Sequence, residues 1–316
     1  MALGSNQVTT TIAGNFIPEL WSDEVIGAYK SNLVVANLVT KLSHKGKKGD
    51  TIHIPVPARG AASAKAVNTQ VTLSAATNTV ISVSIDKHYE YSKLIEDIAE
   101  VQALASMRKF YTDDAGYALS KQVDTDLVTL WEGLQSGTVG GSNAAAWETA
   151  YIGSTGTTAY TGNSSNAADI TDAGIRALIL KLDNADVPMD NRSFIIPPIV
   201  ANDMLGLNRF TEQQYIGNGD AIRTGKIGMI YGVDVFVTTN CPTVKSSGGT
   251  GNSAAGTERV GVLLHKDALV LAEQVGVRSQ TQYKAEYLGD LFVTDTIYGV
   301  AELRNDAAVA FVVPGT

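Results

Sequence analysis

The sequence predicts an α+β fold in which a long β-hairpin is followed by a very long helix and then by an α/β region. Three observations predict this order. Alternating apolar residues flank a weakly hydrophobic stretch and indicate the hairpin, and apolar residues at a spacing of four indicate the helix. Short apolar runs separated by glycine and proline indicate the α/β region.

The composition is that of an ordered globular chain. The 316 residues are 44% hydrophobic and 18% charged, enough for one large or two smaller domains and incompatible with wholesale disorder. The net charge of −8 argues against specific nucleic-acid recognition as the main role. No run of 18 apolar residues predicts a membrane span, and residues 1–14 lack the charged start and apolar core of a signal peptide.

The only cysteine, Cys241, excludes an intrachain disulfide and favours an intracellular folding compartment. We interpret it as a small buried side chain before the turn residue Pro242.

The first 44 residues are predicted to form an N-terminal arm, with a short amphipathic segment from Pro18 to Tyr29. Period-two alternation over Thr51–Val56 then indicates a strand, and Pro55 and Pro57 imply that it is an edge strand or is not fully paired. Alternation resumes at Val71 and continues to Ile85, while residues 58–70 between the two runs are small and polar. The pattern predicts a protruding hairpin, which needs a partner surface because it has no core of its own.

Helix signals begin near Ile95 and continue to Leu134, with Glu96 and Asp97 in the first turn. Gly116 is the only glycine from Ile95 to Glu132, and no proline interrupts the segment. Some 40 helical residues would span about 60 Å. One apolar stripe runs along the expected helix: it starts with Ile98, Val101, Leu104 and Ala105 and continues through Ala115, Leu119, Val123, Leu127, Leu130 and Leu134.

Residues 136–168 are rich in Gly, Ser, Thr, Asn and Ala, and Trp147, Tyr151 and Tyr160 interrupt this linker-like composition. The segment predicts a long surface loop or a small insertion that can include strand-like pieces. After them, Thr171 or Asp172 is expected to cap a helix that ends before Pro188. A second helix is expected from Pro198. The strands expected in this region are Ser193–Ile196, 226–231, 233–238, Val260–Leu264, 277–287, Leu291–Glu302 and Ala307–Val313.

No catalytic, cofactor-binding or metal-binding constellation is found, so the chain is not expected to be an enzyme. The four histidines lack a helical metal spacing, and a single cysteine excludes a CxxC motif. A nucleophile elbow, a Walker loop and a GxGxxG motif after a strand are all absent. Asp183, Asp186 and Asp190 lack the spacing of an EF-hand calcium loop.

Charged clusters are the remaining candidates for function. The long helix carries Asp113 and Asp114 and also Asp124 and Asp126, which form either a solvated surface or an acidic face for a basic partner. A basic turn after Lys41 is a solvated turn, a phosphate contact or a salt-bridge partner for a neighbouring subunit. The candidate contacts between subunits are Lys45, Lys47, Lys48, Arg59, Lys65, Asn68, Asp113 and Asp114.

The order of elements resembles the capsid fold first described in phage Hong Kong 97, as found in major capsid proteins of tailed bacteriophages. Three phrases are similar to those of phage capsid proteins: Arg192–Pro198 (RSFIIPP), Gly225–Pro242 (GKIGMIYGVDVFVTTNCP) and Tyr298–Val313 (YGVAELRNDAAVAFVV). The resemblance covers nearly the whole chain, and residues 136–168 fit it least well. It implies an N-terminal arm (1–44), an E-loop hairpin (45–92), a peripheral domain (93–169 and 285–316) with a spine helix at about 95–134, and an axial domain (170–284).

The resemblance also implies a function and a location. Such subunits self-assemble into pentamers and hexamers of an icosahedral head that encloses double-stranded DNA without sequence specificity. The chain would be made in the bacterial host cytoplasm and reside in the virion, without membrane contact or cofactor. The expected partners are a separate scaffolding protein, a portal and a decoration or cement protein. Some members of the fold join a Lys to an Asn of another subunit, and the residue pattern does not show that Lys65 and Asn68 react.

Three other functions compete with this one. An encapsulin-like bacterial nanocompartment would share the fold and package an enzyme. An α/β enzyme would need a polar pocket with a titrating residue, which the sequence does not offer. A secreted surface protein or adhesin would fit the Thr/Gly/Ser-rich loops, but the missing signal peptide argues against it.

Overall fold

A computed structural model describes most of the chain in segments that together hold two sheets, a hairpin and three longer helices. The described residues are 34–43, 49–56, 60, 62–71, 73, 78–97, 107–134, 147, 150–161, 166–207, 228–244 and 258–315.

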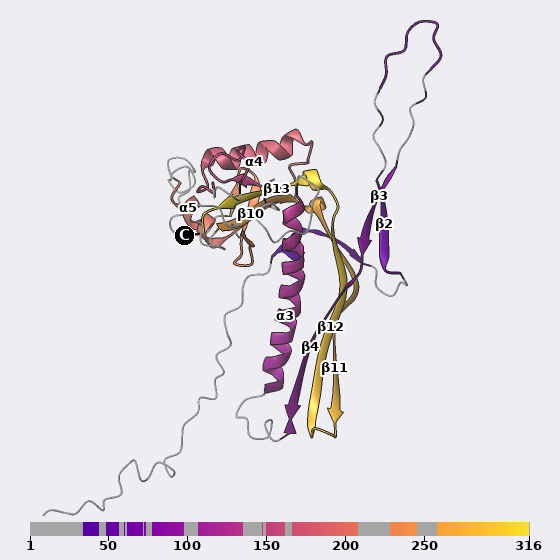
Figure 1. Cartoon of the computed structure of the whole chain (residues 1–316), viewed down its shortest axis with the longest axis vertical. Coiled ribbons are helices and arrows are strands. Elements are labelled where there is room, and N and C mark those ends of the chain that lie inside the picture. Colours follow the sequence, from indigo (N-terminus) through magenta and orange to yellow (C-terminus); the bar gives the residue numbers. More distant parts are fainter. Residues whose placement is uncertain are drawn as a thin grey trace, which may run out of the picture.

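A four-stranded sheet and the helix α3 (Met107–Thr129) form the elongated half of the molecule (Figure 1). The order of its strands is β1 (Thr40–Ser43), β11 (Leu269–Lys284), β12 (Gly289–Glu302) and β4 (Lys87–Glu96). β11 and β12 pair in antiparallel register over almost their whole length. Helix α3 packs against β4, β11 and β12, so one face of the sheet is partly covered by the helix.

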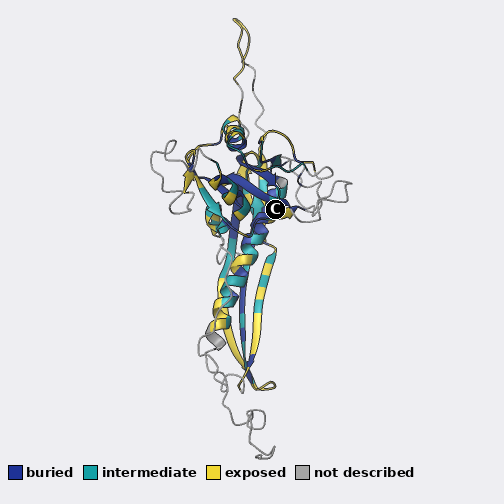
Figure 2. Cartoon of the chain, turned by 90° about the vertical axis from the view of Figure 1, so that its left-hand side faces the viewer, coloured by how far each residue is buried: buried dark blue, intermediate teal, exposed yellow. Residues whose placement is uncertain are grey.

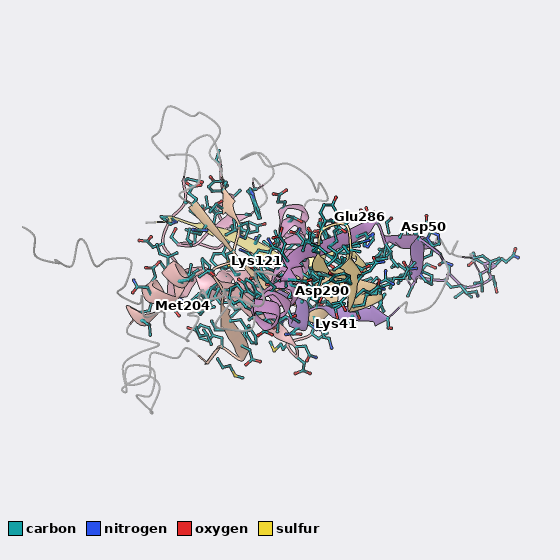
Figure 3. All side chains as sticks on the ribbon, turned by 90° about the horizontal axis from the view of Figure 1, so that it is seen from below. Lys41, Asp50, Lys121, Met204, Glu286 and Asp290 are labelled. Atoms are coloured by element: carbon teal, nitrogen blue, oxygen red, sulfur yellow. The ribbon has the colours of Figure 1, made fainter. Side chains whose placement is uncertain are left out.

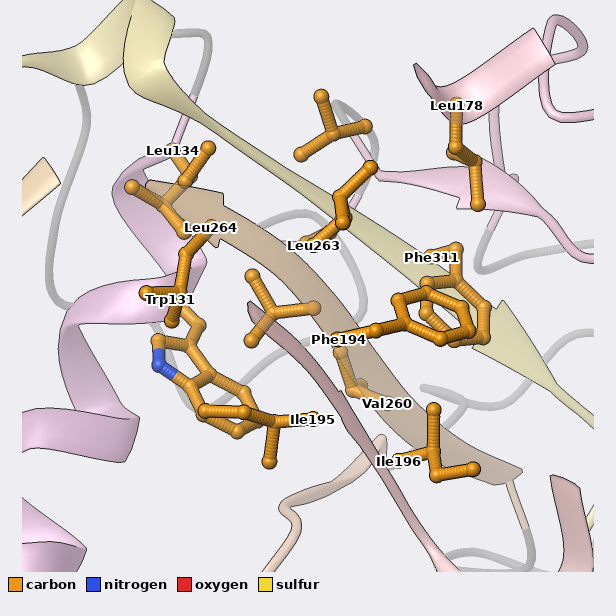
Figure 4. Packing of buried hydrophobic residues seen from close by; sticks show 14 of the residues in the cluster. Trp131, Leu134, Leu178, Phe194, Ile195, Ile196, Val260, Leu263, Leu264 and Phe311 are labelled. Carbon is orange, nitrogen blue, oxygen red and sulfur yellow. The ribbon is translucent and has the colours of Figure 1, made fainter. Parts of the chain in front are cut away.

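The second sheet is seven-stranded and forms a compact α/β half with α4 (Asp172–Asn184) and α5 (Pro198–Leu205). Its core combines Phe194 of β6 with Phe311 of β13, whose rings stack at 5.3 Å (Figure 4). Trp131, in the short helix η2 (Leu130–Gly133) that follows α3, is fully buried in the same core. The strands are β5 (Tyr151–Ile152), β13 (Ala308–Val313), β10 (Glu258–His265), β6 (Arg192–Ile196), β8 (Val233–Val237) and β7 (Met229–Ile230), with β9 (Thr243–Val244) paired to β10.

The hairpin is built by β2 (Thr51–Val56) and β3 (Thr79–Ser84), which pair antiparallel as a separate two-stranded sheet. The prediction of a protruding hairpin is therefore confirmed. β2 pairs only with β3 among the described strands, as Pro55 predicts for an edge. The predicted start of the second strand at Val71 is wrong, because β3 begins at Thr79.

The root of the hairpin is held by a small apolar cluster. Val83 and Ile85 pack against Val270 and Ala272 of β11, on a part of the elongated sheet that is separate from the main core. Beyond this root the hairpin projects away from α3 (Figure 1). Seen along the long axis, Asp50 at the hairpin root and Met204 in the α/β half lie on opposite sides of the molecule (Figure 3).

The predicted start of the long helix near Ile95 is wrong. Ile95 and Glu96 end the strand β4, and the helix α3 begins at Met107, while residues 98–106 lie outside the described part. Pairing of β4 with β12 over ten positions overrides the local helix signals, as tertiary context commonly does. The helix of 23 residues spans about 35 Å instead of about 60 Å.

The apolar stripe of the helix is confirmed. Ala115, Leu119 and Leu127 are buried, and Leu134 closes the stripe in the core of the α/β half. The stripe residues Ile98, Val101, Leu104 and Ala105, which the sequence also assigns to the helix, lie outside the described residues.

Where the structure describes residues 136–168, the strand-like pieces are confirmed, because β5 pairs in parallel with β13. The prediction of a surface loop is wrong for Trp147 and Tyr160, which are almost fully buried. Their aromatic side chains fill the core of the α/β half, which explains why they interrupt a linker-like composition. Residues 135–146, 148, 149 and 162–165 lie outside the described part.

Local signals in the α/β half are confirmed. The Thr171 side chain accepts a hydrogen bond of 3.1 Å from the backbone N–H of Gly174 and caps α4, as expected. Between β7 and β8, Tyr231 and Gly232 both have positive φ (49° and 79°), which is typical of a tight type I′ hairpin turn.

At two places the predicted domain boundaries do not coincide with the division of the chain between the two sheets. Residues 269–284, assigned to the axial domain, form β11 of the elongated sheet, and residues 308–313, assigned to the peripheral domain, form β13 of the seven-stranded sheet. The short helices η4 (Lys266–Ala268) and η5 (Asn305–Ala307) lie where the chain passes between the sheets. The N–H groups of Leu303 and Arg304 both bond to the carbonyl of Ala268, which ties the two crossings together.

Candidate subunit interface

The tip of the hairpin is an ordered turn that presents apolar side chains to solvent. Asn68 adopts a left-handed conformation (φ 61°), and the backbone N–H and the hydroxyl of Thr69 both donate to the carbonyl of Ala66. Val67 and Leu73 are 89% and 92% exposed. Exposed residues gather on this hairpin and at the opposite end of the long strands (Figure 2). An exposed apolar tip on an arm without a core is suited to contact another molecule.

The predicted contact residues fall into three groups. Lys65 and Asn68 are exposed at the hairpin tip. Asp113 is exposed on α3, whereas Asp114 is partly buried and accepts a hydrogen bond of 3.1 Å from the Tyr91 hydroxyl. Desolvation and the Asp114 carboxylate raise the pKa of Tyr91. Lys45, Lys47, Lys48 and Arg59 lie outside the described residues. The structure does not bring the tip and the acidic pair together within one subunit (Figure 1).

The solvated or partner-binding roles predicted for Asp124 and Asp126 are wrong, because both residues are buried. The Asp124 carboxylate accepts a 2.9 Å hydrogen bond from the backbone N–H of Ala36, in the short helix α1 (Val35–Leu38). Burial raises the pKa of Asp124, and the Ala36 N–H opposes that rise. Asp124 therefore fixes the place where α1 meets α3.

Asp126 joins α3 to two strands of the elongated sheet. Its carboxylate accepts hydrogen bonds from the Tyr298 hydroxyl of β12 (2.7 Å) and the Gln122 amide (3.0 Å). The Lys87 ammonium of β4 lies 3.4 Å from it. One signal could have located both acids: Asp124 is three residues before Leu127 and Asp126 three after Val123, so each neighbours the apolar stripe on a helix.

A second charged cluster joins β11, β12 and β4. The Arg278 guanidinium makes two hydrogen bonds to the Asp295 carboxylate, at 2.7 and 2.8 Å, and His88 Nε2 lies 3.1 Å from the same group. Arg278, followed by His88, lowers the pKa of Asp295 to about 2. The register of β11 on β12 shifts just before Arg278, so this pair fixes the alignment of the strands beyond the irregularity.

A groove lies between α3, α1 and the adjacent face of β11 and β12. Its volume is about 470 Å³. A Cβ atom added at Gly116 would meet no atom within 4 Å, so the helix does not close on the sheet at this point. Side chains lining the groove include Ala36, Leu119, Ser120, Val123, Leu271 and Val277.

The described residues contain neither a cluster of metal-ligating side chains nor an exposed cysteine. No group of three or more His, Cys, Asp or Glu side chains in this part of the chain could hold a metal ion. Cys241 is buried as predicted, and burial raises the pKa of its thiol to about 12, so it stays protonated. Asp183, considered above for calcium, instead lies 2.7 Å from the guanidinium of the buried Arg192.

None of the described helices has the length and apolar character needed to cross a membrane. The exposed hairpin tip, the groove beside α3 and the charged surfaces are suited to contacts between proteins.

Comparison with known proteins finds solved structures whose architecture is similar to that of the whole chain. No family model and no curated protein matches the sequence. Among solved structures, one from "Mycobacterium phage Che8" is 22% identical, with a TM-score of 0.72 over 94% of this chain and 97% of that one. The capsid structure of the cyanophage P-SCSP1u is 20% identical, with a TM-score of 0.75 over 99% and 97%. The head structure of the Helicobacter pylori bacteriophage KHP40 is 13% identical, with a TM-score of 0.70 over 99% of both chains.

These matches extend over the hairpin, the long helix and both sheets, because each covers more than nine tenths of the chain. The fold expected from the order of elements is thereby confirmed: the chain has the Hong Kong 97-type capsid fold of tailed bacteriophages.

Proposed function

We propose that this chain is the major capsid protein of a tailed bacteriophage and that it self-assembles into the pentamers and hexamers of an icosahedral head. The observation that carries the proposal is the projecting hairpin, whose exposed tip lies far from any core of its own subunit. Full-length likeness to capsid structures supports the same function. The role is structural, and catalysis forms no part of it.

The contacts in such a shell are heterologous: an arm of one subunit meets a different surface of the next, and a fixed rotation closes the ring. Each contact can be weak because many act together. We propose that Lys45, Lys47, Lys48, Arg59, Lys65, Asn68, Asp113 and Asp114 contribute to these contacts. The opposite charges on the hairpin side and on α3 support this assignment.

The division into arm, E-loop hairpin, peripheral domain and axial domain also belongs to the proposal. Sheet membership favours placing β11 with the peripheral domain and β13 with the axial domain. We further propose that the head encloses double-stranded DNA without gripping it by sequence, since the net charge is −8. A separate scaffolding protein, a portal and a decoration or cement protein are the proposed partners.

The test is the state of the full-length chain after expression. Purified protein, with a scaffolding protein where one is needed, should form closed particles or ring oligomers by electron microscopy and light scattering. Particles recovered with nuclease-protected DNA would support the phage head. Particles filled with a folded enzyme would instead support an encapsulin-like compartment, and a chain that stays monomeric under all these conditions would refute both.

A further inference from the structure

We infer that α1 docks on α3 with the uptake of one proton by Asp124, so that pH regulates how firmly this segment is held. The device lies within a single subunit and goes beyond the proposed assembly, so either can fail without the other. It follows from three features of the structure: an apolar anchor, a buried carboxylate and surroundings that carry no positive charge.

Two valines attach α1 to the core. Val35 is completely buried, Val39 directly after the helix is 1% exposed, and both belong to the main apolar core. Removing these side chains from water favours docking. The same contact covers Asp124 on α3, which is 0% exposed. Docking of α1 therefore buries a carboxylate together with its own apolar side chains.

Docking leaves the Asp124 carboxylate with little compensation for the water that it loses. Its Oδ1 accepts the Ala36 N–H at 2.9 Å, whereas its Oδ2 has no hydrogen-bond partner among the described residues. The Asn240 side chain and the N–H groups of Val34 and Val35 face the carboxylate and offset only part of the loss. A buried carboxylate without full hydrogen bonding favours its neutral form.

The surroundings of Asp124 do not neutralise it either. The titratable groups near it are acids, phenols and a thiol: Glu273, Asp126, Tyr117, Tyr298 and Cys241. None of these groups can carry a positive charge, and negative charge nearby disfavours ionisation of Asp124. The Lys87 ammonium pairs with Asp126 and not with Asp124. Among the described residues, no lysine, arginine or histidine contributes to the pKa of Asp124.

Proton uptake and docking are therefore linked. Burial raises the pKa of Asp124 in the docked state, whereas a carboxyl group exposed to water keeps the ordinary value of 3.8. The docked state thus binds the proton more tightly than the released state. Docking is firmest below pH 3.8 and weakens as the pH rises through the raised pKa of the docked state.

Release of α1 does not require release of the strand that follows it. β1 pairs in parallel with β11 over four positions, and its Leu42 packs on the small cluster at the hairpin root. The Thr40 hydroxyl lies 3.2 Å from the Lys266 carbonyl and 2.9 Å from the Asp267 carboxylate. None of these contacts involves Asp124, so β1 provides an internal reference for the opening of α1.

Hydrogen exchange of the full-length chain, measured by mass spectrometry across acidic and neutral pH, tests the linkage. The exchange rate of α1 is divided by that of β1, because the chemical effect of pH on exchange is common to both. We expect this ratio to rise with pH in the wild type, by at most about tenfold per pH unit because one proton is involved. In Asp124→Asn, which cannot ionise, the ratio should not change with pH.

Val35→Ala is the matched control. It removes part of the apolar anchor and leaves Asp124 in place, so the ratio should exceed the wild-type ratio at every pH and still rise with pH. A wild-type ratio that does not change with pH would overturn the inference, and so would an equal rise in Asp124→Asn. Should Asp124→Asn fail to fold, the wild-type ratio decides. Neither result would alter the proposed capsid function, which depends on contacts between subunits.

Discussion

Asp124 and Asp126 are two residues apart and hold different parts of the subunit. Asp124 binds the backbone of α1, and Asp126 binds the side chains of two strands. From the sequence, both positions are expected to lie on a solvated surface or on an acidic face for a basic partner, because charged residues on a long helix are usually solvated. Spacing from the apolar stripe places them at its border, but spacing alone does not reveal the Ala36 N–H or the Tyr298 hydroxyl that they bind.

Replacing Asp124 tests its anchoring role. Asp124→Ala removes the acceptor of the Ala36 N–H in a buried site, so we expect the free energy of unfolding to fall by about 1–3 kcal/mol. Asp124→Asn keeps a carbonyl oxygen that can accept the same bond and should lose less. Urea unfolding followed by circular dichroism measures both, and equal losses for the two variants would contradict this role.

Asp295 gives the subunit a defined dependence on pH. Its folded pKa of about 2 lies below the ordinary value of 3.8, so the unfolded chain binds the proton more tightly. The stabilisation from Asp295 is therefore complete above pH 3.8 and is lost as the pH falls towards about 2.

We expect Asp295→Asn to be less stable than the wild type at neutral pH and equally stable near pH 2. Urea midpoints measured across this range provide the test. Asp86→Asn, which changes an exposed acid between β3 and β4, is the control and should show no such convergence. A stability gap for Asp295→Asn that does not change with pH would argue against the ion pair with Arg278.

At the scale of elements, the direction of the hairpin depends on a close approach between two strands. A Cβ atom at Gly299 of β12 would lie 2.1 Å from the carbonyl oxygen of Ser84, at the end of β3. Only glycine lets the hairpin root lie this close to the elongated sheet. The cluster of Val83 and Ile85 on β11 then fixes the root in place.

Gly299→Ala should therefore displace the hairpin root and lower the free energy of unfolding by about 1–3 kcal/mol, the usual cost of forcing atoms into a packed site. Hydrogen exchange should rise in β3 more than in the α/β half. Gly228→Ala is the control, because a Cβ atom there meets nothing within 4 Å. Unchanged exchange in β3 would show that the close approach does not hold the hairpin.

The sequence predicts best those elements that are specified locally. Helix α4 follows from the cap at Thr171 and its apolar spacing, and the β7–β8 turn follows from Gly232. β4 is missed because its partner, β12, lies about 200 residues further along the chain. For the same reason the sequence does not reveal that β11 and β13 belong to different sheets.

At the scale of the whole molecule, two sheets are joined by paired crossings at η4 and η5, and a hairpin extends from one of them. The order of elements was enough to predict this fold. The candidate interface was predicted only in part: the hairpin tip and Asp113 remain exposed, whereas the groove beside Gly116 depends on how α3 packs on the sheet. Packing between elements that are distant in the sequence cannot be derived from the spacing of residues within one element.

The central claim is that the hairpin tip makes contacts between subunits and none that its own subunit needs. Deleting residues 58–70 removes the tip beyond the pairing of β2 and β3. Sedimentation velocity of the wild type and the deletion variant, with circular dichroism of each, measures assembly and folding together. We predict that the wild type sediments as particles or rings, while the variant is folded and sediments as single subunits. A variant that unfolds, or one that assembles like the wild type, would contradict the claim.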